Sequence, residues 1–159
     1  MEMINFERAV ELAQSTLNTT QIEQCLELDA PGSRKIILWH AVRELAHGWM
    51  FPYNSLNCIE MGNALLGNGP VLVSRWGTIE SLGTGSSIEN RIHNYESNHR
   101  VSILKFSALA AFKKVDIKPM RETELYRQKL DSYRTYIACK AIPELKDRWL
   151  RQLQDLETT

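Results

Sequence analysis

The stretch Gly67-Asn68-Gly69-Pro70-Val71-Leu72-Val73-Ser74-Arg75-Trp76-Gly77 separates two parts of the sequence that differ in character. Its first four residues form the strongest break in the chain, because glycine and proline favour turns and interrupt helices. The next three form a short apolar run with two β-branched valines, bounded on both sides by turn residues. This composition is typical of a buried strand, so we predict a strand near residues 70–76.

Before this stretch the chain has a helical pattern, and we predict a helical part over residues 1–67. Asn5 can cap a first helix, and Thr20 can cap a short second one. Apolar residues at steps of three and four then predict a third helix over 34–47 and a fourth over about 55–66. Glycine or proline follows the second, third and fourth of these helices, as expected where a helix ends.

After the strand, we predict a strand-loop-helix part over residues 70–112 and a C-terminal helix pair over 119–157. Apolar and aromatic side chains recur at steps of three and four along both helices of the pair, and Pro143 suits the first turn of the second. Residues 101–106 fit either a second strand or more helix, and we favour the strand. We therefore expect a single domain over residues 1–159 with an α-rich α/β or α+β fold, mostly helices with at most a small sheet.

Length and charge narrow the class of protein. The chain has 159 residues, enough for one packed core, and its 19 basic and 19 acidic side chains give a formal net charge of zero. Proteins that coat nucleic acid or an anionic membrane need a surplus of positive charge, so neither role is the expected one. No apolar run approaches the roughly 20 residues that span a bilayer. Three widely spaced cysteines and no export signal at the N-terminus lead us to expect reduced thiols in a soluble, cytoplasmic protein with no membrane span.

Two groups of polar residues lie on the predicted third helix. His40, Glu44 and His47 are spaced to share one helix face, and Glu44 with His47 has the spacing of one half of a di-iron site. A di-iron site also needs further inward-facing glutamates, so we favour a simple polar face. Arg34 and His40 have the spacing found in some helical toxin nucleases, where arginine holds phosphate and histidine acts as acid or base. Such pairs are common by chance.

Aromatic residues gather in the same region. Trp39, Trp49, Phe51 and Tyr53 could form an exposed edge for a partner, since exposed tryptophan and tyrosine carry a large share of interface energy. They could instead belong to the core, which we favour. Cys139 lies beside a helical stripe and, like Cys25, is most simply a core residue.

The end of the predicted strand carries the residues best suited to chemistry. Ligands usually bind at the carboxyl ends of the strands in an α/β sheet. There Arg75 could hold a phosphate through two parallel hydrogen bonds, and Gly77 could let the backbone approach a ligand closely. Glu80 could serve a metal or act as a base. The plainer alternative is a strand that ends in a solvated turn, with Arg75 and Glu80 paired to each other.

The run Leu72-Val73-Ser74-Arg75-Trp76-Gly77-Thr78-Ile79-Glu80 resembles the R-x-G-x-x-E segment of bacterial polysaccharide glycosyltransferases of the GT-D type. The small-residue and aromatic segment at 107–112 and the tyrosine-rich segment at 124–136 occupy places comparable to those in that family. The resemblance does not cover residues 1–60. Better-known members have an aspartate at the position of Thr78, which completes a D-x-E pair for a divalent metal.

This resemblance implies a nucleotide-sugar-binding, glycosyltransferase-like domain, and the departure at Thr78 leaves open whether that domain is partial or inactive. Arg75 and Gly77 would bind the nucleotide sugar, and Glu80 would be the catalytic residue, as a base or as the ligand of a divalent metal. Because Thr78 leaves Glu80 alone, we assign no metal site, and both the cofactor and enzymatic activity stay open. The alternative is a non-catalytic helical protein that binds and regulates another macromolecule.

A second alternative is a protein that acts on nucleic acid. It would use Arg34 and His40, or the C-terminal helices, since residues 111–159 carry 11 basic and 8 acidic side chains. A net charge of zero makes this the least favoured of the three.

Overall fold

The computed structural model of the chain describes residues 2–24, 34–62 and 69–159. Over these ranges, α-helices cover more than half of the residues and every strand pairing is antiparallel, which makes the fold α-rich α+β as predicted. The chain divides into two compact units, Met1–His93 and Asn94–Thr159, with the boundary inside helix α3 (Ile88–Lys113). That residues 1–159 act as a single domain remains a prediction.

The N-terminal unit contains a four-stranded antiparallel sheet in the order β2-β3-β5-β6. Its strands are β2 (Arg43–Leu45), β3 (Gly48–Phe51), β5 (Val71–Ser74) and β6 (Ile79–Ser81). The strand predicted near 70–76 is β5, and it lies inside the sheet between β3 and β6. All residues of β3 and β5 are buried, which explains why neither strand shows the apolar-polar alternation of a half-exposed one.

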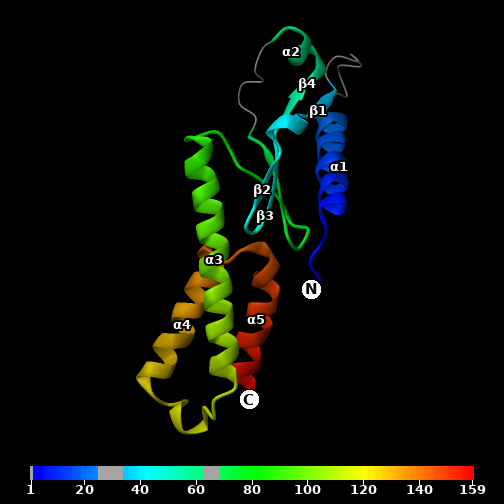
Figure 1. Cartoon of the computed structure of the whole chain (residues 1–159). Helices are drawn as coiled ribbons and strands as arrows, with labels where there is room; N and C mark the ends of the chain where they lie inside the picture. The colour runs from blue at the N-terminus through cyan, green and yellow to red at the C-terminus, as the bar shows by residue number, and fades with distance from the viewer. Residues whose placement is uncertain (1, 25–33, 63–68) are drawn as a thin grey trace. The chain divides into compact units, whose positions relative to one another are not determined.

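Helix α1 (Phe6–Gln24) lies along one face of this sheet (Figure 1). Its buried residues Ala9, Ala13 and Leu17 recur every four positions, so they share one side of the helix. They pack in one cluster with side chains that alternate along β3 and β5 and therefore point to the same face: Trp49, Phe51, Val71 and Val73. The short second helix predicted from Thr20 is the end of α1.

A two-stranded pairing continues the hairpin of β2 and β3. It joins β1 (Lys35–Ile37) to β4 (Tyr53–Ser55), and β4 leads directly into the short helix α2 (Leu56–Glu60). Ser55 caps α2, because its Oγ accepts a hydrogen bond from the Cys58 amide at 3.2 Å. A helix therefore starts close to residue 55, as predicted.

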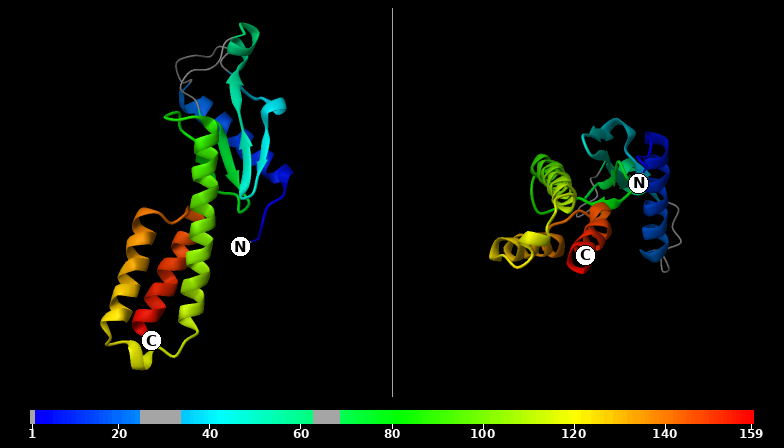
Figure 2. Two further views of the ribbon diagram at one scale, coloured as in Figure 1. Left: turned by 60° about the vertical axis from the view of Figure 1, so that its left-hand side comes forward. Right: turned by 90° about the horizontal axis from the view of Figure 1, so that it is seen from below.

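The C-terminal unit is a bundle of three helices, formed by α3 from Asn94 onward, α4 (Glu124–Cys139) and α5 (Pro143–Thr158), shown in Figure 2. A single apolar cluster fills it, with Trp149 fully buried and the rings of Tyr133 and Tyr136 packed edge-on against its indole. The helix pair predicted over 119–157 is confirmed. In the described part of the chain, no helix is both long and apolar enough to cross a membrane.

The predicted helical character of residues 1–67 is wrong over 34–47. These residues form β1, the 3-10 turn η2 (Trp39–Ala41) and β2, and the following residues form β3 and β4. The apolar steps of three and four resemble a helix only because the turn interrupts the strand, while the pairing of Ile36 and Ile37 with β4 fixes the extended backbone. The fourth helix is shorter than predicted, since α2 ends at Glu60 and residues 61 and 62 form a turn.

Residues 101–106 lie within α3, so the strand that we favoured there is wrong. Ser102 and Leu109 are buried while Val101 and Leu104 are exposed, which is the spacing of one helix face rather than an alternation. Cys139 is exposed, so its predicted place in the core is also wrong. Cys25 lies outside the described residues.

Candidate functional site

The segment that resembles the glycosyltransferases forms the β5–β6 hairpin, and Ser74 organises its turn. The buried Ser74 Oγ accepts hydrogen bonds from the amides of Trp76 at 3.2 Å and Thr78 at 3.1 Å. Gly77 takes a left-handed backbone with φ of +82°, which only glycine adopts at little cost. Ser74 and Gly77 therefore have a structural reason to be serine and glycine.

Arg75 connects this turn to the neighbouring hairpin of β2 and β3. One Nη donates to Glu44 Oε1 at 2.7 Å and to the Leu45 carbonyl at 3.0 Å. The guanidinium carbon lies 4.2 Å from the centroid of the Trp49 ring, a cation–π distance. Its backbone amide donates to the His47 carbonyl at 2.9 Å. Arg75 thus has a carboxylate, a carbonyl and an aromatic face as partners, all on β2, β3 and the turn between them.

Gly77 and Glu80 lie in different surroundings. A Cβ built on Gly77 would contact Leu12 and Ile4 at 3.6–3.7 Å, so this glycine faces the N-terminal segment and α1. Glu80 lies opposite Leu72 on β6, an edge strand of the sheet, and is half-buried. The carboxylate that pairs with Arg75 is that of Glu44, so the predicted pairing of Arg75 with Glu80 is wrong.

The antiparallel sheet removes one reason for expecting a ligand here. The carboxyl ends of strands gather at one edge only when the strands are parallel, whereas β3 and β6 run opposite to β5. The argument from strand ends in α/β sheets therefore does not apply to β5. The assignment of Arg75, Gly77 and Glu80 to a nucleotide-sugar site depends on the sequence resemblance alone.

The polar groups predicted on a third helix do not lie on a common α-helix. His40 lies in η2, Glu44 on β2 and His47 in the turn before β3, so they do not share a helix face. Arg34 precedes β1 and is separated from His40 by the whole of that strand. The helical spacing that suggested a metal half-site and a nuclease pair is absent from this described segment.

The four aromatic residues that could have formed an exposed edge separate into two groups. Trp49 is 4% exposed and Phe51 is fully buried, and both rings pack against the ring of Phe6. Tyr53 is half-buried, and this burial raises the pKa of its phenol above the ordinary value. Trp39 is different, with 58% of its surface exposed. The core prediction is therefore right for Trp49 and Phe51 and wrong for Trp39.

Trp39 is exposed because the chain inserts residues into a strand. Ile37 faces Tyr53 in one pairing and Arg43 faces Met50 in the next, so five residues on one strand oppose two on the other. The Leu38 amide still donates to the Pro52 carbonyl at 2.8 Å, which keeps the strands together beside the insertion. The extra residues, Trp39–Ala41, fold into η2, with the Ala41 amide donating to the Leu38 carbonyl at 2.9 Å. Bulges of this kind commonly redirect a side chain at functional sites.

A second polar group lies buried in the C-terminal unit. His99 and Glu144 are both nearly inaccessible, with His99 Nε2 3.7 Å from Glu144 Oε1 and His99 Nδ1 3.0 Å from the Tyr95 carbonyl. Ser102, also buried, lies one turn along α3 from His99. The helix periodicity predicts that Tyr95 and His99 share a face, and their ring centroids do lie 4.1 Å apart, with the ring planes tilted by 49°. Glu144 could not be foreseen, because a carboxylate one residue after Pro143 ordinarily lies in water.

No family model, curated protein or solved structure matches the chain. The geometry is therefore the basis for a functional proposal. In the N-terminal unit it offers one large aromatic side chain on a defined bulge, together with an arginine whose side chain already has its partners.

Proposed function

We propose that the protein is a non-catalytic binding module for another protein and that Trp39 is its main contact residue. The observation that carries this proposal is the exposure of Trp39, 58%, on a bulge whose backbone hydrogen bonds hold it in place. Leaving an indole in water gives up about 1.5–3 kcal/mol of the free energy that burying such a side chain provides. A partner that covers Trp39 recovers this free energy on binding.

The position of Trp39 suits an interface anchor. Tryptophan is among the residues most enriched at interface hot spots, where one large rigid side chain enters a pocket of the partner. The residues at the two ends of η2, Leu38 and Val42, are half-buried, so the bulge has a fixed base. An anchor that is already ordered loses little conformational entropy on binding.

The test is a site-specific photo-crosslink in the cell that makes the protein. We expect benzoylphenylalanine at position 39 to capture a defined protein, and the same group at the exposed Glu60 in α2 to capture none. With that protein purified, Trp39→Ala should weaken binding at least about thirtyfold, and the neighbouring His40→Ala by less than about threefold. Equal crosslinking from both positions, or unchanged affinity of Trp39→Ala, overturns the proposal.

The nucleotide-sugar hypothesis is the alternative, and the GT-D resemblance supports it. To bind a diphosphate, Arg75 would exchange Glu44 and the Leu45 carbonyl for phosphate oxygens. The test is a thermal-shift screen with nucleotide sugars, with and without manganese, because a ligand of the folded state must raise the melting temperature. A shift that disappears in folded Arg75→Ala protein would favour this alternative over a protein-binding role.

A further inference from the structure

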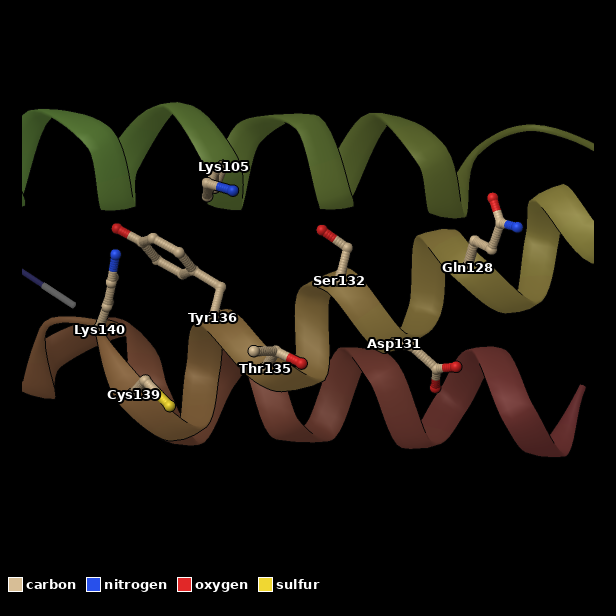
Figure 3. Close-up of a pocket in the computed structure, with 8 residues that line it drawn as sticks. All are labelled: Lys105, Gln128, Asp131, Ser132, Thr135, Tyr136, Cys139 and Lys140. Carbon is tan, nitrogen blue, oxygen red and sulfur yellow. The ribbon is translucent and has the colours of Figure 1, made fainter.

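The C-terminal unit has a groove between α3 and α4 that the proposed function does not use. The groove has a volume of about 470 Å³, and Figure 3 shows the side chains that line it. Lys105 comes from α3, while Gln128, Ser132, Tyr136 and Lys140 follow one another along α4 and its C-terminal end. From Gln128 to Lys140 the helix advances about 18 Å, at 1.5 Å per residue.

The groove has a net positive charge, with two lysines against one aspartate in its lining. Within the described residues, neither Lys105 nor Lys140 has an ion-pair partner; Lys105 Nζ lies 4.5 Å above the Tyr136 ring instead. The carboxylate of Asp131 also lines the groove; Arg134 pairs with it at 2.8 Å and pairs with Glu157 as well. At the other end of the groove, the side-chain amide of Gln128 donates a hydrogen bond to the Glu124 carboxylate at 3.2 Å. The end of the groove at the two lysines is thus ready to accept anionic groups.

Tyr136 forms a fixed wall of this groove and supplies a donor. Its hydroxyl lies 3.0 Å from Oγ of the buried Ser102, and its ring packs edge-on against Trp149 at 5.3 Å. Ser102 Oγ accepts from the Ile142 amide at 3.3 Å, and its own hydrogen can then go to the Tyr136 oxygen. The hydroxyl hydrogen of Tyr136 remains available to a ligand. In Figure 3 this hydroxyl points to the same side of α4 as the ammonium group of Lys140, a residue one helical turn further along the chain.

We propose that this groove binds an acidic segment of a partner protein, with carboxylates of that segment placed at Lys105 and Lys140. The hydroxyl and amide groups of Ser132, Thr135 and Gln128 suit the peptide backbone of such a segment. The unit as a whole carries 13 basic and 9 acidic side chains, and this local surplus favours an acidic partner at short range.

Apolar side chains flank the groove and complement an acidic peptide better than a nucleic acid. Val101 lies one turn before Lys105 on α3, and Leu125 lies one turn before Gln128 on α4; both are exposed. A segment with apolar residues on either side of its acidic ones can contact both. This proposal depends on residues of the C-terminal unit alone, so it stands or fails independently of Trp39.

The experiment titrates the full-length protein against a fluorescein-labelled peptide of alternating glutamate and leucine, read by fluorescence anisotropy. We expect saturable binding that Lys105→Glu/Lys140→Glu weakens at least about tenfold. The matched control is Lys114→Glu/Lys146→Glu, which makes the same change in net charge at exposed lysines outside the groove and should stay within about threefold of the unchanged protein. Circular dichroism verifies that both variants fold.

Two further variants and a second probe complete the test. Lys105→Gln/Lys140→Gln should also lose most of the binding without introducing repulsion, and Tyr136→Phe should lose part of it. Three results overturn the proposal: no binding of the peptide, equal losses in the groove and control variants, or tighter binding of a labelled oligothymidylate than of the peptide through the same lysines. The last of these results assigns the groove to nucleic acid.

Discussion

The guanidinium carbon of Arg75 lies 4.2 Å from the centroid of the Trp49 ring, while one Nη of Arg75 donates to Glu44 at 2.7 Å. These contacts join the β5–β6 turn to β2 and β3. The Arg75 side chain is 25% exposed, so water screens the charges only in part. We expect Arg75→Ala to lower the free energy of unfolding by about 1–2 kcal/mol, measured by urea denaturation, because the stacking and the hydrogen bonds are lost together.

Two variants separate the contributions of stacking and ion pairing at Arg75. Glu44→Gln should cost no more than about 1 kcal/mol, because the Glu44 side chain is 67% exposed and exposed ion pairs contribute little. Arg75→Lys keeps the charge but not the planar guanidinium group. Its loss of unfolding free energy should therefore lie between the losses of Glu44→Gln and Arg75→Ala. A loss in Glu44→Gln as large as that in Arg75→Ala would show that the ion pair, and not the Trp49 ring, is the main contact.

Trp39 and Trp49 should differ strongly in their response to the same substitution. Trp49→Ala removes a buried ring from the cluster under α1 and should cost about 3–5 kcal/mol in unfolding free energy. Trp39→Ala removes an exposed ring and should change stability by no more than about 0.5 kcal/mol. The comparison is made by urea denaturation of both variants. A large loss in Trp39→Ala would mean that this indole packs within the protein and is not available to a partner.

The parts of the fold that could be predicted have local causes. The strand at Val71–Ser74 follows a break at Gly69 and Pro70, and α4 and α5 show regular apolar spacing that their buried cores confirm. The segment over 34–47 resembles a helix in the sequence because its strand character depends on pairing. β1 pairs with residues 16 to 20 positions further along the chain, and β2 pairs with residues three to seven positions further along. A three-residue bulge also shifts the apolar spacing from that of a strand to one that resembles a helix.

The candidate site could be predicted only in part, for a related reason. Arg75 stands out in the sequence as a lone basic residue at the end of a buried strand. Its partners Glu44 and Trp49 lie about thirty residues earlier, and no local pattern links them to it. The exposure of Trp39 follows from the offset between two strand pairings, which the sequence pattern does not encode.

Gly69 and Gly83 approach each other so closely that an alanine at position 69 should destabilise the fold. A Cβ on Gly69 would lie 2.6 Å from the backbone oxygen of Gly83, closer than any ordinary contact. Gly69→Ala should therefore force the backbones apart and cost about 1–3 kcal/mol. Gly85→Ala is the matched control, since a Cβ there meets no atom within 4 Å, and it should be neutral or stabilise by up to about 1 kcal/mol. Equal thermal stability of the two variants would contradict the close approach.

Arg43 and Glu89 predict a specific pH dependence. Arg43 on the edge strand β2 donates to Glu89 in the first turn of α3 at 2.7 Å, and this hydrogen bond, with the charge of Arg43, holds the pKa of Glu89 below its ordinary value of 4.5. The folded state therefore releases this proton more readily than the unfolded state does. The resulting stabilisation is complete above pH 4.5 and is lost as the pH falls through the lower pKa of the folded state. Arg43→Gln should remove this part of the acid sensitivity, seen as a shallower fall of melting temperature below pH 4.5, and Glu89→Gln should do the same. An unchanged slope in both variants would mean that the pair does not persist in solution.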